Sequence, residues 1–421
     1  MGFTLIRCGK LYDGLQDTLQ ADMEIIVEDD RIREVGKKLA CPEGAVLHDL
    51  SATLVTPGLI DAHIHTENFS NFKDDVYTLF RSDEWKTLAA LYCAGQSLRH
   101  GFTTLRVPGV FVGDSYGLAD VRRAIDGGYF PGARLNISFF ALGGSGGHSD
   151  VTQDLRENPR MADIWEEHLP AVANGPDAFR KIVRRQIKYG ADFIKIMATG
   201  GFGSPYDAPD DFHLAEDEMA AIIDTAHQLG KPVTAHAIAP AQIKMLVALG
   251  VDGIEHGSLL DEDTIRLMEE RDVYLVPTIG VFEPLLDEEK LAKRNHYAQQ
   301  KMRRHGGQMR KTVELVRQSR LRLGYGTDFM AGCECYESGY EYGAFLRAGY
   351  DPFRALAAAT RVNAGIVGNA DIGAIAPGKL ADIAAFDTTD VADENALMNC
   401  TFAMKGGQVT CEKQGLVDSH D

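Results

Sequence analysis

The feature that most constrains the fold is a regular alternation of short apolar segments with amphipathic segments of helical periodicity, from residue 58 to residue 369. The apolar segments have the length and composition of strands and fall at 59–65, 103–107, 134–140, 193–197, 233–237, 253–256, 274–277 and 323–327. This alternation is typical of βα units around a parallel sheet. Eight units close on themselves more readily than they form an open sheet. We therefore predict an α/β fold, a (β/α)8 TIM barrel formed by residues 58–369.

The two ends of the chain differ from this middle part because their strand segments have no helices between them. Strand patterns occur at 4–7, 23–27 and 31–35 before the barrel, and at 378–386 and 402–405 after it. The second and third segments flank a polar turn, which is a hairpin pattern. We predict that residues 1–57 and 370–421 together form a small composite β-domain, a β-sandwich made by both chain ends.

Charge and composition limit the classes of partner. The chain has 43 basic and 61 acidic residues, a net charge of −18, which disfavours phosphate backbones and anionic lipids. We expect no nucleic-acid partner, no membrane partner and no secretory signal, since no apolar run of about 18 residues or leader pattern is present. The 7 scattered cysteines suit a reducing compartment, so we predict a cytoplasmic protein.

Histidines close the first predicted strand in the sequence Asp61-Ala62-His63-Ile64-His65. Side chains two residues apart in a strand point to the same face, so both imidazoles can reach one ion. A histidine pair of this kind also occurs in packed cores, and alone it does not establish a metal site.

Lys195 lies in the middle of an apolar strand segment, Phe193-Ile194-Lys195-Ile196-Met197. A bare ammonium group is costly to bury there. One interpretation is a buried ion pair. The other is that CO2 carboxylates the amine, and the resulting carbamate bridges two metal ions, which a free lysine without acceptor atoms could not do.

Three further polar residues each end a different predicted strand. His236 and His256 end consecutive strands and are 20 residues apart, the expected length of one βα unit. Asp328 follows the last strand, where it would exchange a proton with a metal-activated water and the leaving group. Taken singly, each histidine has a structural alternative, and Asp328 has the alternative of a helix N-cap. The joint pattern favours metal ligation.

The six residues together resemble the site of the amidohydrolase superfamily, in its binuclear form with a carboxylated lysine. The segment 371–383 (DIGAIAPGKLADI) also resembles that family's C-terminal signature. The resemblance covers nearly the whole chain. It implies that His63, His65 and Asp328 hold one divalent metal, that His236 and His256 hold the other, and that the carbamate of Lys195 bridges both with a hydroxide. Imidazole and carboxylate ligands favour zinc.

Within that superfamily the chain is similar to the imidazolonepropionase-related branch, which contains prolidase-like and arginine-carboxypeptidase-like enzymes. The matching segments are 143–150 (GGSGGHSD), 193–201 (FIKIMATGG), 234–237 (TAHA) and 255–257 (EHG). The resemblance implies that His148 binds the scissile carbonyl oxygen and supports catalysis there, where negative charge develops. The alternative is an exposed loop histidine.

Two positions depart from the pattern of this branch. Ile238 replaces a tyrosine that follows the strand-five histidine by two residues, so a phenol that helps peptide cleavage is absent. Arg106 matches a family arginine but is followed by Val107 instead of aspartate. Arg106 has two interpretations, binding of a substrate carboxylate or bracing of the barrel floor.

These observations predict a metal-dependent hydrolase that cleaves a C–N amide bond of a small-molecule substrate with a hydroxide that bridges two metals. The predicted substrate is an Xaa-Pro-type dipeptide or an N-acyl amino acid. Because of Ile238, a urea, carbamate, lactam or lactone is the alternative, and outside enzymes the alternative is a non-catalytic barrel scaffold. The branch also predicts a homo-oligomer.

Overall fold

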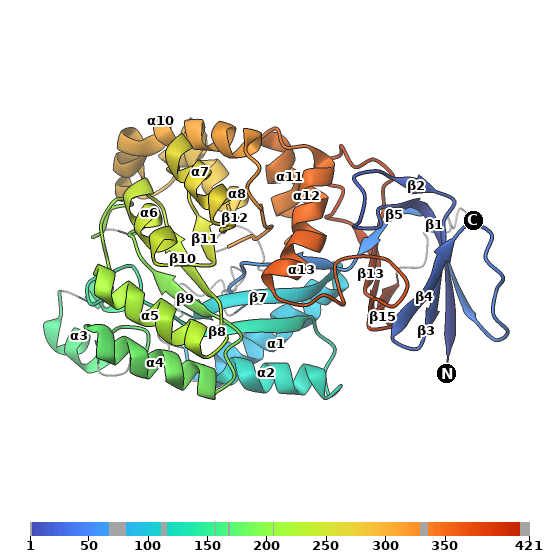
Figure 1. The fold of residues 1–421 in the computed structure, drawn as a ribbon, viewed down its shortest axis with the longest axis horizontal. Helices are drawn as coiled ribbons and strands as arrows, with labels where there is room; N and C mark the ends of the chain where they lie inside the picture. The colour runs from blue at the N-terminus through green and yellow to red at the C-terminus, as the bar shows by residue number, and fades with distance from the viewer. Residues whose placement is uncertain are drawn as a thin grey trace, which may run out of the picture.

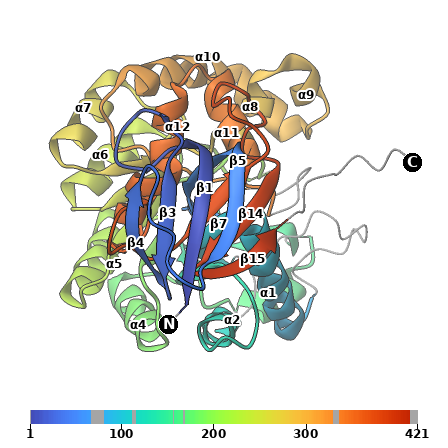
Figure 2. The same ribbon diagram turned by 90° about the vertical axis from the view of Figure 1, so that its right-hand side faces the viewer.

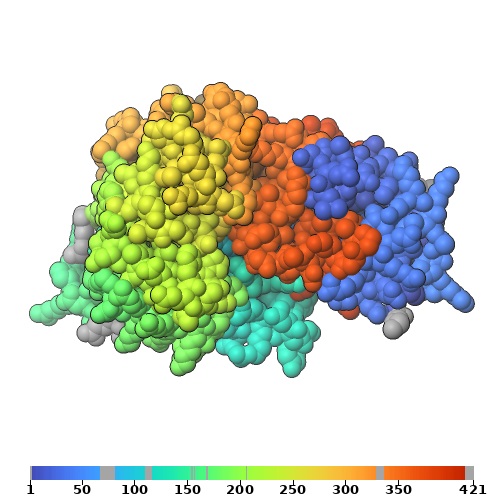
Figure 3. All heavy atoms as spheres, viewed as in Figure 1, coloured from blue at the N-terminus to red at the C-terminus, as the bar shows by residue number. Residues whose placement is uncertain are grey.

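The structure is a computed structural model and describes residues 2–66, 81–110, 116–155, 157–166, 169–204, 206–328 and 336–412. It contains two sheets. A parallel sheet lies inside a layer of helices, and a second sheet without such a cover stands beside it (Figure 1). The helical segment that includes α12 (Pro352–Ala357) and α13 (Asn363–Ile366) fills the space between the two parts on the face shown in Figure 3.

The parallel sheet accounts for seven of the eight predicted strands. Its order is β12-β11-β10-β9-β8-β7-β6, and each neighbouring pair is parallel. The strands are β6 (Leu59–Asp61), β7 (Phe102–Val110), β8 (Arg134–Leu142), β9 (Ile194–Met197), β10 (Val233–Ala237), β11 (Gly253–His256) and β12 (Tyr274–Val276). The apolar runs of the sequence therefore identify these strands correctly.

The eighth predicted strand, 323–327, is not part of a named strand, but its backbone contacts both edges of the curled parallel sheet. Gly324 N donates to the carbonyl of Leu275 in β12 at 2.8 Å. On the other side, Ala62 N donates to the carbonyl of Tyr325, also at 2.8 Å. The structure thus shows a curled parallel sheet, while a complete barrel of eight strands is not confirmed.

Helices connect the parallel strands and cover the sheet. They are α1 (Asp83–Arg99), α2 (Gly117–Asp126), α3 (Pro159–Glu166), α4 (Pro176–Lys188), α5 (Glu216–Gln228), α6 (Pro240–Ala248), α7 (Glu262–Glu270), α8 (Ile279–Leu286), α9 (Glu288–Ala292), α10 (His296–Gln318), α11 (Tyr340–Arg347), α12 (Pro352–Ala357) and α13 (Asn363–Ile366). A 3-10 turn, Val151–Leu155, precedes α3, and a π-helical turn, Ala358–Val362, joins α12 to α13.

Side-chain caps in the local sequence determine where several helices begin. The carboxylate of Asp261 and the amide oxygen of Asn295 accept backbone N–H bonds at the first turns of α7 and α10.

The second sheet is built from both ends of the chain, as Figure 2 shows. Its order is β15-β14-β13-β5-β1-β3-β4, with β2 paired to β1; only the β1–β5 pair is parallel. The strands are β1 (Phe3–Leu11), β2 (Gln20–Ala21), β3 (Glu24–Glu28), β4 (Arg31–Gly36), β5 (Val46–Pro57), β13 (Ile383–Phe386), β14 (Cys400–Lys405) and β15 (Gln408–Glu412). The described residues place these strands in one sheet, so the predicted β-sandwich is not confirmed.

Polar contacts join the two sheets where β5 runs into β6. Asp382, just before β13, forms a two-point ion pair with Arg134 at the start of β8. Lys405, at the end of β14, donates from Nζ to the carbonyl of Gly132. These contacts fix the chain-end sheet at the amino ends of the parallel strands, away from the strand ends that carry the histidines.

No helix within the described ranges combines the length and the apolar character that crossing a bilayer requires.

Candidate active site

Histidine and aspartate side chains from separate strand ends meet at the carboxyl end of the parallel sheet. Nε2 of His65 lies 3.2 Å and Nε2 of His63 lies 3.4 Å from Oδ1 of Asp328. Nδ1 of His256 lies 3.8 Å from Oδ2 of the same carboxylate. Three of the residues, His63, His256 and Asp328, offer ligand atoms that all lie within 4.8 Å of one another.

The four imidazoles form a continuous cluster. The ring centroids of His63 and His65 are 5.4 Å apart, those of His63 and His256 are 5.0 Å apart, and those of His256 and His236 are 4.7 Å apart. All four side chains are buried. Burial lowers the pKa of His236 and of His256 well below the ordinary value, which favours the neutral imidazole that binds metals.

Lys195 belongs to the same cluster. It is 2 % exposed and lies close enough to His236, His256, Glu255 and Asp328 for their charges to interact. Burial lowers the pKa of its amine to about 8, although the Glu255 and Asp328 carboxylates oppose this. Among the described residues no carboxylate lies within ion-pair distance of the amine, which disfavours the interpretation of Lys195 as one half of a buried ion pair.

The second ring nitrogen of several histidines is held by a protein acceptor. Nδ1 of His63 contacts Oε2 of Glu255 at 2.7 Å, and Nδ1 of His65 contacts the carbonyl of Gly109 at 2.9 Å. This arrangement is usual around metal ligands because it fixes the ring and leaves Nε2 for the ion. Nδ1 of His256 contacts Oγ1 of Thr278 at 2.7 Å, whereas Nε2 of His236 lies 3.1 Å from the carbonyl of Gly200. The donor set therefore fits a divalent metal.

The backbone at this end of the sheet is locally unfavourable. Three residues at or just after the ends of β11, β12 and the segment 323–327 have positive φ angles: 73° at His256, 48° at Thr278 and 49° at Asp328. These angles lie in the left-handed region that few residues other than glycine adopt. Each such residue costs about 1 kcal/mol or more, and such residues concentrate at functional sites. The backbone segments are also crowded at this end of the sheet. This crowding explains why residue 326 is glycine, because a Cβ there would lie 2.6 Å from the Cβ of His63.

An ion pair lies beneath the histidines and corrects one prediction. Arg106 donates to Oε1 of Glu255 at 2.8 Å and to the hydroxyl of Tyr274 at 2.9 Å, and its guanidinium stacks on the ring of Phe193. Arg106 is 1 % exposed and is enclosed by these partners. The structure therefore supports the bracing interpretation of Arg106 and not the substrate-binding one.

Glu255 connects the arginine to the histidine cluster. Burial alone would raise the pKa of its carboxyl, but Arg106, His63 and Lys195 together hold it well below the usual range. Thr234 also donates to Oε1 at 2.6 Å. Glu255 is thus a permanent anion that orients His63.

His148 lies at the edge of the cluster of imidazoles. Its ring stacks on that of His236, with centroids 4.8 Å apart and planes 21° apart. Nδ1 contacts Oδ2 of Asp207 at 2.8 Å. Burial would raise the pKa of Asp207, but His148, Ser204 and Lys301 more than offset this and hold it far below the usual range. The side chain of His148 is 22 % exposed, unlike the buried imidazoles.

Sequence reasoning did not single out Glu255, Asp207, Thr278 or Lys301, which hold the predicted residues in place. Glu255 has a local signal, since an acidic residue directly before a strand-end histidine is unusual in an apolar segment. Nζ of Lys301 donates to Oδ1 of Asp207 at 3.0 Å and to two backbone carbonyls of the loop before it. Lys301 and Asp207 are 94 residues apart, so no local pattern links them.

Ile238 packs into an apolar cluster at the same end of the sheet. The cluster also contains Phe202, Leu259, Leu285 and Met302, and Ile238 is buried within it. The side chain that replaces the expected phenol is therefore part of a hydrophobic wall.

Comparisons with known proteins agree with this geometry. The model of the amidohydrolase family matches residues 54–411. Ochratoxinase of Aspergillus niger is 29% identical over 298 residues, which cover 67% of this chain and 60% of that protein. The match thus spans about three fifths of the length of these curated relatives.

Two solved structures resemble the whole chain. A crystal structure of an Xaa-Pro dipeptidase with bound methionine has a TM-score of 0.85 at 29% identity and covers 97% of this chain and 99% of that one. A crystal structure of a prolidase complexed with N-methylphosphonate-L-proline has a TM-score of 0.82 at 27% identity and covers 98% of this chain and 100% of that one.

Proposed function

Because the chain belongs to the amidohydrolase family, we propose that it is a metal-dependent hydrolase that cleaves a C–N amide bond of a small substrate. The observation that carries this proposal is the convergence of four buried imidazoles, Lys195 and Asp328 at one end of the parallel sheet. A site of this kind destabilises the fold unless it binds a ligand, since it concentrates buried polar groups.

The donor set favours two divalent ions, with zinc as the preferred metal. His63, His65 and Asp328 would hold one ion, His236 and His256 the other, and Lys195 as a carbamate would be shared between them. When bound, such ions polarise a substrate carbonyl and lower the pKa of water. The low dielectric of the site and the near-neutral pKa of Lys195 favour the uncharged amine that reacts with CO2.

The protein's own groups then perform three tasks. Asp328 accepts the proton of the attacking water on a carboxylate oxygen and delivers it to the departing nitrogen. His148 donates from Nδ1 to the Asp207 carboxylate, and when the ring carries a proton on both nitrogens Nε2 can donate a hydrogen bond to the carbonyl oxygen as negative charge develops there. Glu255 and Arg106 keep His63 in place from below.

We propose an Xaa-Pro-type dipeptide or an N-acyl amino acid as the substrate. The likeness to an Xaa-Pro dipeptidase and to a prolidase over nearly the whole chain supports this class. A urea, carbamate, lactam or lactone is the second candidate. It is favoured by Ile238, which places an apolar wall where a peptide-cleaving relative of this branch would offer a phenol.

We also propose that residues 323–328 serve as the eighth strand of a closed (β/α)8 barrel, with residues 1–57 and 370–421 as a separate domain. The hydrogen bonds from this segment to both sheet edges support the closure. The cytoplasmic location and the homo-oligomer stay predictions.

The test combines metal analysis with a substrate panel. Purified wild-type protein should contain about two zinc ions per chain and hydrolyse members of a panel of Xaa-Pro dipeptides and N-acyl amino acids. Lys195→Ala should lose metal and turnover together, while Lys188→Ala, at an exposed lysine of α4, should keep both. Full activity in Lys195→Ala would refute the carbamate.

Two other results would change the proposal. Turnover of carbamates or lactones without any turnover of dipeptides would replace the first substrate class by the second. Properly folded wild-type protein that retains almost no metal would revive the non-catalytic scaffold.

A further inference from the structure

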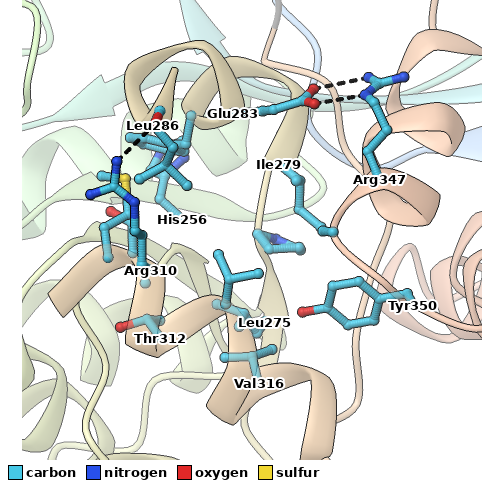
Figure 4. Close-up of a pocket in the computed structure, with 17 residues that line it drawn as sticks. His256, Leu275, Ile279, Glu283, Leu286, Arg310, Thr312, Val316, Arg347 and Tyr350 are labelled. Atoms are coloured by element: carbon cyan, nitrogen blue, oxygen red, sulfur yellow. Dashed lines mark hydrogen bonds and ion pairs between the residues drawn. The ribbon is translucent and has the colours of Figure 1, made fainter. Parts of the chain in front are cut away.

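A cavity of about 330 Å³ lies in the helical layer beside the proposed metal centre. Its walls come from α8, α10, the end of α11 and strand β12 (Figure 4). Leu275 of β12 and Val316 of α10, both buried, form its base. Leu275 is flanked in β12 by Tyr274, which contacts Arg106 inside the sheet, so Leu275 points outward to the helices. The cavity therefore lies outside the curled sheet, and it shares only His256 with the proposed metal ligands.

The cavity is partly open to solvent, and its lining is mostly apolar. An apolar molecule that fills it would displace water from apolar surface, which favours binding. A volume of about 330 Å³ suits a molecule of two rings or similar size.

Two hydroxyl groups in the cavity wall have no protein partner among the described residues. Ser258 is 8 % exposed, and its Oγ is fully buried without a hydrogen bond. The hydroxyl of Tyr350, in the segment between α11 and α12, points toward Leu275 and Val316, as Figure 4 shows, and forms no hydrogen bond with a described residue. The Tyr350 hydroxyl can therefore pair with a ligand that carries a hydrogen-bonding group, and the buried Oγ of Ser258 is a second unpaired polar atom in the wall.

The charges at the rim indicate a neutral ligand. Arg347 forms a two-point ion pair with Glu283 across the cavity, at 2.6 Å and 2.9 Å, and a further bond to Glu394. Arg310 donates to the carbonyl of Leu286 and is exposed to solvent. No charged group without a partner faces the apolar base, and an ion there would lose its hydration without compensation.

We propose that this cavity binds a small neutral molecule with an aromatic or branched aliphatic body and one hydroxyl-type group, at a site distinct from the metal centre. The cavity is connected to that centre through Thr278. Pro277 and Ile279 line the cavity on either side of Thr278 in the sequence, and Oγ1 of Thr278 contacts Nδ1 of His256 at 2.7 Å. A bound molecule that packs on these neighbours holds Thr278 against His256. Occupancy of the cavity and metal binding should therefore favour each other.

The binding test uses 2-naphthol as the probe and isothermal titration calorimetry with the full-length protein, so it requires no knowledge of the substrate. Wild-type protein should bind one 2-naphthol per chain. Val316→Phe, which fills the base of the cavity, should weaken binding at least tenfold, while Gln318→Phe, on the exposed face of the same helix, should leave it unchanged. Equal binding by wild type and Val316→Phe would overturn the site.

A second comparison tests the hydroxyl groups without a bulky substitution. Ser258→Ala and Tyr350→Phe should each reduce the affinity for 2-naphthol about threefold to tenfold, but should leave the affinity for naphthalene unchanged. Tighter binding of 2-naphthoate than of 2-naphthol would contradict the neutral class of ligand. An unchanged affinity for 2-naphthol in both variants would contradict the role of the hydroxyls.

The connection to the metal centre has its own readout, and this part rests on the proposed function. 2-Naphthol should bind at least threefold more tightly to zinc-loaded protein than to metal-free protein, and Thr278→Val should abolish this difference. Equal affinities in wild type would refute the connection while leaving the binding site intact. Failure to bind zinc at all would refute the proposed function without affecting the result for 2-naphthol.

Discussion

The two sheets of this protein use burial in opposite ways. The chain-end sheet buries apolar side chains such as Ile25, Leu54 and Phe402, each fully excluded from solvent. The carboxyl end of the parallel sheet instead buries imidazoles, a lysine amine and the carboxylates of Glu255 and Asp328. Apolar burial stabilises a fold by about 25 cal/mol per Å², whereas buried ionisable groups stabilise it little or destabilise it. The chain-end sheet therefore stabilises the fold, whereas the carboxyl end of the parallel sheet carries the groups of the proposed reaction.

Backbone geometry shows the same contrast. In the chain-end sheet, non-glycine residues with positive φ lie in turns, as Asp29 does between β3 and β4. In the parallel sheet, His256 and Asp328 have positive φ at strand ends that bear proposed ligands. In the turns, a positive φ angle reverses the direction of the chain. At the strand ends, a positive φ angle instead orients the side chains of the proposed ligands toward one point. Substitutions in the chain-end sheet should affect stability alone, whereas substitutions of the proposed ligands should affect mainly turnover.

The largest expected effect is on turnover at Asp328. Asp328→Asn removes the carboxylate that contacts His63 and His65 and that would carry the proton, so turnover should fall about a thousandfold or more. The free energy of unfolding of the metal-free protein should fall rather than rise, because His63, His65 and His256 outweigh burial and hold the pKa of the Asp328 carboxyl well below its usual range, so the ionised group stabilises the fold. Steady-state kinetics and urea unfolding measure the two quantities.

Asp263→Asn, at an exposed carboxylate of α7, is the matched control and should alter neither quantity. Retention of wild-type turnover by Asp328→Asn would show that the two regions do not differ in the way proposed.

The next effect concerns the ion pair beneath the site. Arg106→Met leaves the carboxylate of Glu255 buried without its cation, which should lower the free energy of unfolding by about 3–5 kcal/mol. Arg180→Met, which removes an exposed ion pair with Asp177, should change it by less than about 0.5 kcal/mol. Chemical denaturation of metal-free protein gives both values. A raised KM with unchanged stability in Arg106→Met would restore the substrate-binding interpretation.

A slightly smaller effect is expected in the chain-end sheet, and there it should be confined to stability. Leu54→Ala should lower the free energy of unfolding by about 3 kcal/mol, since Leu54 is fully buried and its removal leaves a cavity. Leu47→Ala, at a position 48% exposed in the same strand, should cost well under 1 kcal/mol. Turnover of both folded variants should match wild type. Reduced turnover in Leu54→Ala below its unfolding temperature would argue against the separation of roles.

The sequence predicted the strands because they depend on local pattern. Apolar runs identify β9, β10 and β11; Lys195 lies inside the first of these runs, and His236 and His256 lie at or near the ends of the other two. Each of these strands is buried on both faces, so the run has few polar interruptions. The segment 323–327 was also predicted as a strand; backbone hydrogen bonds join it and its flanking residues to Leu275 of β12 and to Ala62 and His63, but it is not part of a named strand.

The partners of the site residues could not be predicted, because they come from distant parts of the chain. Arg106 and Glu255 are 149 residues apart, and His148 and Asp207 are 59 apart. Periodicity indicates which side chains are buried but not which buried groups meet. For this reason the two interpretations of Arg106 could be separated only by the structure, and the burial of Ile238 in the apolar cluster that also contains Phe202 had no sequence signal.

The smallest expected effect lies at the junction of the two regions and depends on pH. Burial lowers the pKa of the Lys405 amine from 10.5 to about 8, and the nearby Arg134 adds to this, while Asp382 opposes it. Between these two pH values the unfolded chain retains a proton that the folded chain has released. A rise in pH therefore favours the folded state, and the contribution of Lys405 to stability should increase by roughly 1–3 kcal/mol from pH 8 to pH 10.5.

Lys405→Met removes this titration, so the difference in free energy of unfolding between wild type and variant should shift in favour of wild type across that pH range. Urea unfolding at half-unit pH intervals measures it, and Lys188→Met on the exposed face of α4 provides the matched comparison. A difference that is constant with pH would mean that the Lys405 amine is hydrated and that the junction is open to solvent. The Arg134–Asp382 pair and the shared apolar core would then join the two sheets without a contribution from the Lys405 amine, and the chain-end sheet would contribute to the stability of the parallel sheet less than the contacts of Lys405 imply.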